Sequence, residues 1–169
     1  MKKAAIFPTP TYFDRYINQV PDLELEDAFA LAYKDLENFD VARYEPRGDW
    51  TYAPGKWTIK DVFLHMIDTE RVFVYRAMSF ARNDKGPLAG FDQDKFVANG
   101  LSKIRTLESL VEEMKYTRKA TEAMFNGFSE AVLLRTGISW KYEISVIAMG
   151  FTIIGHQIHH MQILKERYL

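Results

Sequence analysis

Cysteine is absent from the sequence of 169 residues. Its absence excludes disulfides, cysteine-based zinc sites and a cysteine nucleophile. Any metal ion must therefore be bound by His, Asp or Glu side chains. If the chemistry of the protein needs a thiol, that thiol has to come from a small cosubstrate.

Long hydrophobic runs are missing as well. The N-terminal sequence MKKAAIFPTP has only a few apolar residues before Pro8 and Pro10, whereas a signal peptide needs about 7–15 in a row. No stretch approaches the roughly 20 apolar residues of a membrane span. We therefore expect a cytoplasmic protein that has no membrane partner.

An excess of charge of one sign is also lacking. The chain has 22 Lys and Arg residues against 23 Asp and Glu residues, which gives a net charge of −1. Acidic and basic residues are interleaved, whereas a nucleic-acid binder usually carries a basic patch or stripe. The charge pattern therefore predicts no nucleic-acid partner.

Hydrophobic residues make up 47% of the chain, which is enough for the core of one domain over residues 1–169. Four segments have apolar residues at helical spacing, and no stretch shows sustained alternation of period two. A short turn of helix is expected near Tyr12–Ile17. Four long helices without strands predict an all-α fold, a four-helix bundle, with helices at about 23–39, 58–83, 102–128 and 144–167.

The second helix and the segment after it carry clear local signals. Thr58 is a good N-cap, and Asp61 can complete a capping box. The segment Asp84–Gly100, with a short helix expected after Asp92, is long for a helix connection, and such segments are often functional. A loop that only covers one end of the bundle is an equally good interpretation. Phe91 in this segment could cover a pocket or simply pack locally.

Three of the four histidines lie close together on the most apolar helix. His156 and His160 are separated by four residues, so they lie about 40° apart around the axis and one turn apart along it. Their imidazoles can point at one ion, as in the HExxH motif. His156 with His159 is also possible, and we prefer His156 with His160. His65, at core spacing on the second helix, can supply a third imidazole.

Three neutral imidazoles and solvent would form an open coordination sphere of the catalytic type. The alternative is that these are core histidines, each with one hydrogen bond. Two unpaired imidazoles in a dry core would each cost about 1–3 kcal/mol. The spacing alone leaves both interpretations open.

Several charged residues follow His65 on the same helix. Asp68 could orient a ligand imidazole or accept a proton from bound water, and a surface pair with Arg71 is slightly favoured over these roles. Glu70 lies about 140° from His65 around the helix and is a poor candidate ligand. Arg76 could bind an anionic substrate group, but we favour a pair with a nearby carboxylate.

Several sequence pieces together resemble one known family. They are Trp57–Asp61 leading to His65, the runs HMIDTERVFVYRAMSFARND and PLAGFDQD, and IIGHQIHHMQILKERYL, which contains His160. In this order and at this spacing they resemble the DinB-like superfamily, and within it the YfiT-related metal-dependent hydrolases. The resemblance covers nearly the whole chain.

This resemblance implies a four-helix bundle of up-down-down-up order that forms a homodimer. It also implies a divalent metal ion (zinc, nickel or manganese-like) on His65, His156 and His160. The implied activity is that of a metal-dependent hydrolase or a thiol S-transferase acting on a small molecule, with a low-molecular-weight thiol as possible cosubstrate. The resemblance implies no DNA binding.

The sequence thus leaves three hypotheses. The first is a metal-dependent enzyme whose candidate catalytic residue is Asp68. The second is a non-catalytic metal-binding bundle with a structural or interaction role. The third is a metal-free interaction module in which the histidines are core residues.

Overall fold

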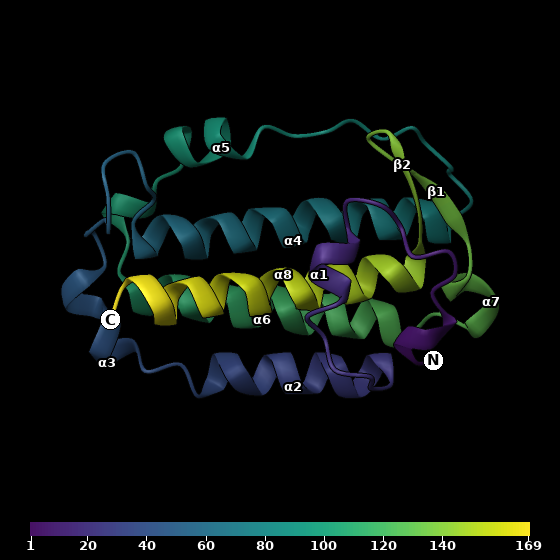
Figure 1. Ribbon diagram of the computed structural model, residues 1–169, viewed down its shortest axis with the longest axis horizontal. Helices are drawn as coiled ribbons and strands as arrows, with labels where there is room; N and C mark the ends of the chain where they lie inside the picture. The colour runs from purple at the N-terminus through teal and green to yellow at the C-terminus, as the bar shows by residue number, and fades with distance from the viewer.

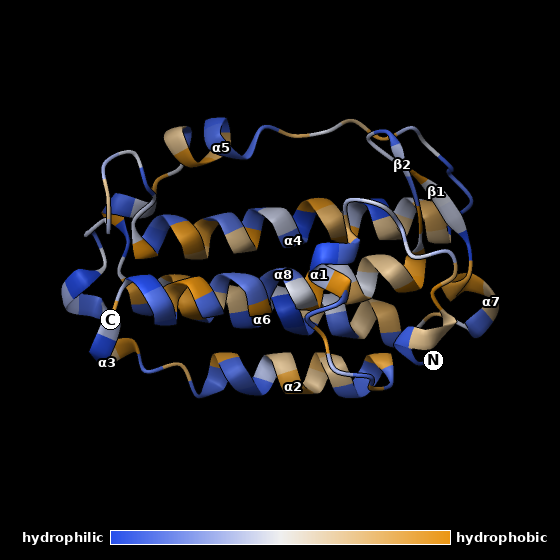
Figure 2. Cartoon of the chain, viewed as in Figure 1, coloured by the Kyte–Doolittle hydropathy of each residue, from blue (hydrophilic) through white to orange (hydrophobic).

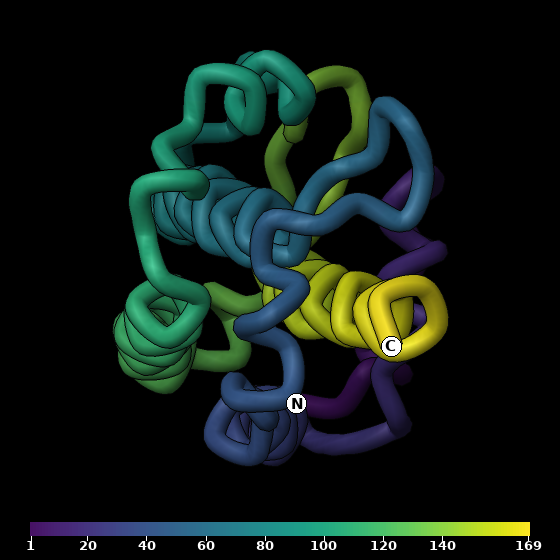
Figure 3. Tube along the Cα trace, turned by 90° about the vertical axis from the view of Figure 1, so that its left-hand side faces the viewer, coloured from purple at the N-terminus to yellow at the C-terminus, as the bar shows by residue number.

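The computed structural model describes residues 1–169, and four long helices form its body (Figure 1). Seen end-on, neighbouring helices follow the order α4, α6, α2, α8 around the bundle (Figure 3). The helices α2 and α8 run in one direction, and α4 and α6 in the other. The prediction of an all-α, up-down-down-up bundle is therefore confirmed, with the helices α2 (Leu25–Glu37), α4 (Ile59–Ala81), α6 (Leu107–Asn126) and α8 (Val146–Arg167).

Side-chain caps mark the starts of three of the long helices, α4, α6 and α8. The capping box of α4 is formed as predicted: the Asp61 amide donates to the Thr58 hydroxyl, and the Thr58 amide donates to the Asp61 carboxylate, both at 3.0 Å. Thr106 caps α6. Because α6 begins only there, Ile104 lies outside the helix and is 80% exposed. The expected start of this helix near residue 102 is therefore too early.

Short elements fill the connections. The helix α1 lies against α8 (Figure 1), and α5, capped by Asp92, lies in the long connection from α4 to α6 as expected. None of the helices combines the length and apolar character that crossing a bilayer would require. The short helices are η1 (Lys3–Ala5), α1 (Asp14–Ile17), α3 (Val41–Tyr44), η2 (Glu45–Arg47), α5 (Gln93–Asn99), η3 (Ser102–Ile104) and α7 (Glu130–Leu133).

A β-hairpin precedes α8, so the prediction of no strands is wrong in this detail. Strand β1 (Thr136–Ser139) pairs antiparallel with β2 (Tyr142–Ser145). Ile144, which we expected in the fourth helix, lies in β2. Strands of four residues are too short to show a convincing alternation of apolar and polar residues.

The long helices are amphipathic, with hydrophobic and hydrophilic residues side by side along α2, α4 and α6 (Figure 2). Together with residues of the connecting segments, their buried apolar residues form two clusters, one of 22 and one of 13 residues. Along α4, α6 and α8, buried polar residues lie between the residues of one cluster and those of the other. We call this set the polar layer; it consists of His65, Thr69, Glu70, Arg118, Thr121, His156, Gln157 and His160.

Candidate metal centre

The three predicted histidines converge in the polar layer. His65 comes from α4, and His156 and His160 come from successive turns of α8. The Nε2 atom of His156 lies 3.1 Å from Nε2 of His65 and 3.1 Å from Nε2 of His160. All three side chains are buried. The predicted convergence is therefore confirmed, with His156 paired to His160 and not to His159.

Hydrogen bonds among the imidazoles satisfy this cluster poorly. A neutral imidazole nitrogen carries either a proton or a lone pair, so His156 Nε2 cannot donate to one neighbour and accept from the other. A cation would satisfy all three lone pairs. Tetrahedral zinc at about 2.0–2.1 Å from each nitrogen would space the nitrogens about 3.4 Å apart, which is close to the 3.1 Å seen for His65–His156 and for His156–His160; all three nitrogens lie within 4.8 Å of one another. The cluster therefore fits a divalent metal ion.

Burial keeps these histidines neutral. Desolvation lowers the pKa of His65 from 6.5 to about 4. For His156 and His160, burial and then the neighbouring imidazoles hold the pKa well below the ordinary value. Metal ligands must be deprotonated, so all three residues are in the form that binds a metal at neutral pH.

Neighbouring side chains fix the ring orientations. The Thr69 hydroxyl lies 3.4 Å from Nδ1 of His65, and the Trp57 ring packs 4.6 Å from the His65 ring centre. Thr69 was missed in the sequence, although its spacing of four residues from His65 could have indicated it. The Nδ1 atom of His160 is buried and has no hydrogen-bond partner in the protein.

A glycine allows the N-terminal segment to reach the histidines. A Cβ atom at Gly155 would clash with the carbonyl oxygen of Tyr16, so only glycine lets α1 approach α8 this closely. The Tyr16 ring consequently lies 5.2 Å from the ring of His156 and 5.7 Å from that of His159. His159 is partly exposed and lies beside His160, at the edge of the site as predicted.

A cavity of about 550 Å³ adjoins His156. A second cavity, of about 250 Å³, reaches His160 from another direction. The histidine cluster is therefore accessible to small molecules, and Phe91 contributes to the wall of the larger cavity. That wall is formed by Tyr12, Phe13, Tyr16, Thr69, Phe73, Arg76, Gly90, Phe91, Asp92, Gln93, Ser139, Trp140 and His156.

Comparison with known proteins places this chain in a family. The sequence over residues 25–164 matches the DinB superfamily. The chain belongs to the DinB superfamily. The resemblance seen in the sequence is therefore confirmed at the level of the family.

The structure of this DinB-superfamily chain is similar to that of YfiT from Bacillus subtilis, with a TM-score of 0.67 and 17% sequence identity. The similarity covers 91% of this chain and 84% of the YfiT chain. YfiT is described as a probable metal-dependent hydrolase with an unusual four-helix bundle topology. At this identity the comparison supports the fold. No curated protein matches the chain.

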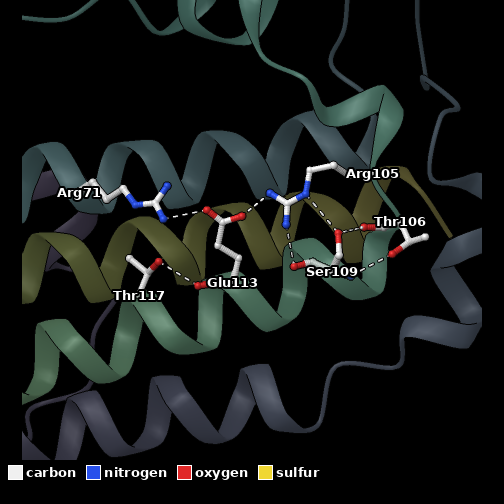
Figure 4. A network of polar contacts seen from close by, with 6 residues as sticks. All are labelled: Arg71, Arg105, Thr106, Ser109, Glu113 and Thr117. Atoms are coloured by element: carbon white, nitrogen blue, oxygen red, sulfur yellow. Dashed lines mark hydrogen bonds and ion pairs between the residues drawn. The ribbon is translucent and has the colours of Figure 1, made fainter.

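Asp68 of this DinB-superfamily chain is partly buried and makes no hydrogen bond or ion pair with any of the histidines. The pair with Arg71 that we favoured is wrong, because Arg71 donates to Glu113 at 2.8 Å and Arg105 binds the same carboxylate (Figure 4). Burial raises the pKa of the Asp68 carboxyl, and Arg71 opposes this shift. A catalytic role for Asp68 stays a prediction.

Glu70 faces away from the histidines and towards α6. Its carboxylate accepts hydrogen bonds from Nε and Nη2 of Arg118, at 3.0 and 2.7 Å, and from the Thr121 hydroxyl at 2.7 Å. All three side chains are buried. Glu70 is thus bound within the protein, in agreement with its prediction as a poor metal ligand.

Arg76 corrects another expectation. It is 4% exposed and forms no ion pair with any carboxylate. Its Nη2 donates to the carbonyl oxygen of Ala89 at 2.8 Å. The expected carboxylate partner is therefore wrong, because the segment that packs over Arg76 presents a backbone oxygen.

Proposed function

We propose that this chain binds one divalent metal ion (zinc, nickel or manganese-like) through His65, His156 and His160 and acts as an enzyme on a small molecule. The reaction is that of a metal-dependent hydrolase or a thiol S-transferase. The observation that carries the proposal is the convergence of three buried, neutral imidazoles beside a cavity large enough for a small molecule.

The bound metal would polarise a substrate oxygen and lower the pKa of a water molecule or thiol at its open position. The protein supplies the rest. Thr69 and Trp57 hold the His65 ring in place, and the aromatic wall of the cavity excludes bulk water from the substrate. Because the chain has no cysteine, a thiol nucleophile would enter as a low-molecular-weight cosubstrate.

Asp68 is the proposed proton acceptor. Its carboxyl group has no ion-pair partner, and burial raises its pKa, which brings the group closer to the pH at which a general base works well. In the metal-loaded protein, Asp68→Asn should lower turnover at least ~10-fold without changing the metal content. An unchanged turnover would remove Asp68 from the mechanism.

A non-catalytic metal-binding bundle is the alternative. In that protein the ion would only stabilise buried imidazoles, and the space around it would be closed to small molecules. The two cavities that reach His156 and His160 favour the enzyme. Turnover of ester, amide and epoxide substrates, with and without an added thiol, separates hydrolase from transferase, and no turnover at all would favour the alternative.

Metal analysis of the purified protein is the decisive experiment. We expect about one divalent ion per chain in the wild type and almost none in His156→Ala. The matched control is His159→Ala, which removes an imidazole three residues along the same helix but outside the cluster. Equal metal content in the wild type and His156→Ala would contradict the proposal.

We also propose a homodimer, on the basis of the family resemblance. Light scattering during size-exclusion chromatography gives the mass of the particle directly. A monomer of 19.7 kDa would contradict this proposal and leave the metal site unaffected.

A further inference from the structure

The larger cavity extends from the histidines along one face of α4. Thr69, Phe73 and Arg76 line it, and they follow His65 at intervals of three and four residues. Arg76 lies eleven residues after His65, so it shares nearly the same face of the helix at a distance of ~16 Å along the axis. The cavity is therefore elongated, with the histidines towards one end and Arg76 towards the other.

Arg76 is a buried cation without a counter-ion. Apart from the bond to the Ala89 carbonyl oxygen, its guanidinium makes no hydrogen bond to the protein. Arg118, the other buried arginine, shows the usual solution, since it is paired with the two oxygens of Glu70. An unpaired buried charge is costly, and burial accordingly lowers the pKa of Arg76. An anionic ligand would supply the missing partner.

Ser139 in the cavity wall also lacks a partner. Its side chain is fully buried, and its hydroxyl has no hydrogen bond in the protein. Buried hydroxyl groups are normally satisfied, so this group is available to a ligand. The Ser139 hydroxyl comes from the hairpin and Arg76 from α4, so two separate elements bring an unsatisfied hydroxyl and a cation without a counter-ion to the same cavity.

The other groups of the wall define the rest of the ligand. Phe73 lies between the two ends, with its ring 5.7 Å from the Arg76 guanidinium carbon and 6.1 Å from the His156 ring. Asp92 is the only carboxylate of the wall; it is exposed and accepts a bond from the Lys95 amide. One cation beside one carboxylate disfavours a doubly charged phosphate. The wall therefore suits an apolar molecule with a single negative charge.

We propose that the cavity binds its substrate through a carboxylate held by Arg76, with the Ser139 hydroxyl as an additional donor. The substrate is then an elongated carboxylic acid with an apolar middle part, and its reacting group lies at the histidine end. The inference rests on the proposed function in taking this cavity as the substrate pocket.

Binding of phenylbutanoate and of its neutral analogue phenylbutanamide to the purified full-length protein, measured by calorimetry, tests the proposal. We expect the carboxylate to bind ~10-fold or more tightly than the amide, because charge-assisted hydrogen bonds are the stronger ones. Equal affinities, or no binding of either compound, would overturn the proposal. Tighter binding of phenyl phosphate than of phenylbutanoate would overturn the assignment to a carboxylate.

Substitutions in the cavity wall test which residue binds the carboxylate. Arg76→Met should abolish the preference for the carboxylate, and the matched control Arg82→Met, which removes an exposed arginine of the same helix end outside the cavity, should retain it. If Arg76→Met does not fold, Arg76→Lys should keep only part of the preference. Ser139→Ala should weaken binding of the carboxylate ~3-fold. A full preference in Arg76→Met or Arg76→Lys would place the carboxylate elsewhere.

The same titration on His160→Ala separates this inference from the proposed function. His160 belongs to the histidine cluster but not to the wall of the larger cavity. The preference should survive in this variant even though metal binding is lost. If the preference disappears with the metal, the carboxylate binds to the ion and not to Arg76, which overturns the inference while leaving the metal site intact.

Discussion

Two buried polar groups share the polar layer, and they differ in how their atoms are satisfied. Between α4 and α6, both oxygens of Glu70 accept hydrogen bonds from Arg118, and Thr121 adds a third donor. Between α4 and α8, Nε2 of His156 lies against Nε2 of both His65 and His160, and a single imidazole nitrogen cannot donate to one of them while accepting from the other. In the first group the Glu70 carboxylate finds all its partners within the protein and only Nη1 of Arg118 is left without one, whereas the second group lacks a partner at its centre.

Both groups depend on the same helix. Glu70 follows His65 by five residues, which turns its side chain about 140° around α4 and towards α6. The comparison teaches that burial alone does not identify a functional polar residue. The informative observation is a buried polar group whose partners are missing from the chain.

The largest loss of stability should come from breaking the buried pair of Glu70 and Arg118. Arg118→Met would leave the Glu70 carboxylate buried without its cation, and removing one partner of a buried ion pair costs about 3–5 kcal/mol. Urea unfolding measures this loss, and the metal content should stay unchanged. The double variant Glu70→Leu with Arg118→Met should recover much of the stability. A loss below about 1 kcal/mol for the single variant would show that the pair is not structural.

A change of pH should act on the histidine group. In the metal-free protein the pKa of His65 is about 4, against 6.5 for a free histidine. As the pH falls below 6.5, the unfolded chain takes up a proton before the folded protein does, so stability is lost progressively until about pH 4. This difference in pKa corresponds to about 3 kcal/mol of unfolding free energy. Urea unfolding at several pH values in the presence of a chelator measures the loss.

The control for this pH effect is His65→Asn. The unfolding free energy of this variant should depend less steeply on pH than that of the wild type. Bound metal should protect the protein until protons displace the ion. A metal-free protein that becomes more stable on acidification from pH 6.5 to 4 would contradict the cause that we assign.

The smallest effect should come from the hydroxyl beside His65. Thr69→Val keeps the shape of the side chain and removes the oxygen that lies 3.4 Å from Nδ1 of His65. Partners of this kind typically change metal affinity 10–100-fold, and we expect ~10-fold because the contact is long. Competition with a chromophoric chelator measures the affinity. No change would show that packing by Trp57 is sufficient to orient the ring.

The sequence predicted those features that repeat along one helix. The four long helices follow from apolar periodicity, and the approach of His156 to His160 follows from their spacing of four residues. Local helix caps such as that of Thr58 were also predictable from the sequence. The core spacing of His65 on the second helix added it to the pair, the family resemblance implied the same three residues, and the structure shows that the three rings meet.

Features that depend on distant partners were not predictable in this way. Glu70 and Arg118 are 48 residues apart, and nothing in either helix alone indicates that they meet. For the same reason we assigned Arg76 a carboxylate that the fold does not provide. The hairpin that carries Ser139 was missed because each strand has only four residues.

The polar layer also affects how the bundle can evolve. It interrupts what could be one continuous apolar core, so replacing its members by well-packed hydrophobic residues would be expected to stabilise the protein while removing the site. Selection for stability alone would therefore fill this layer with leucine and phenylalanine. Relatives that have lost the histidine cluster should be recognisable by an apolar residue at position 156 and a higher melting temperature.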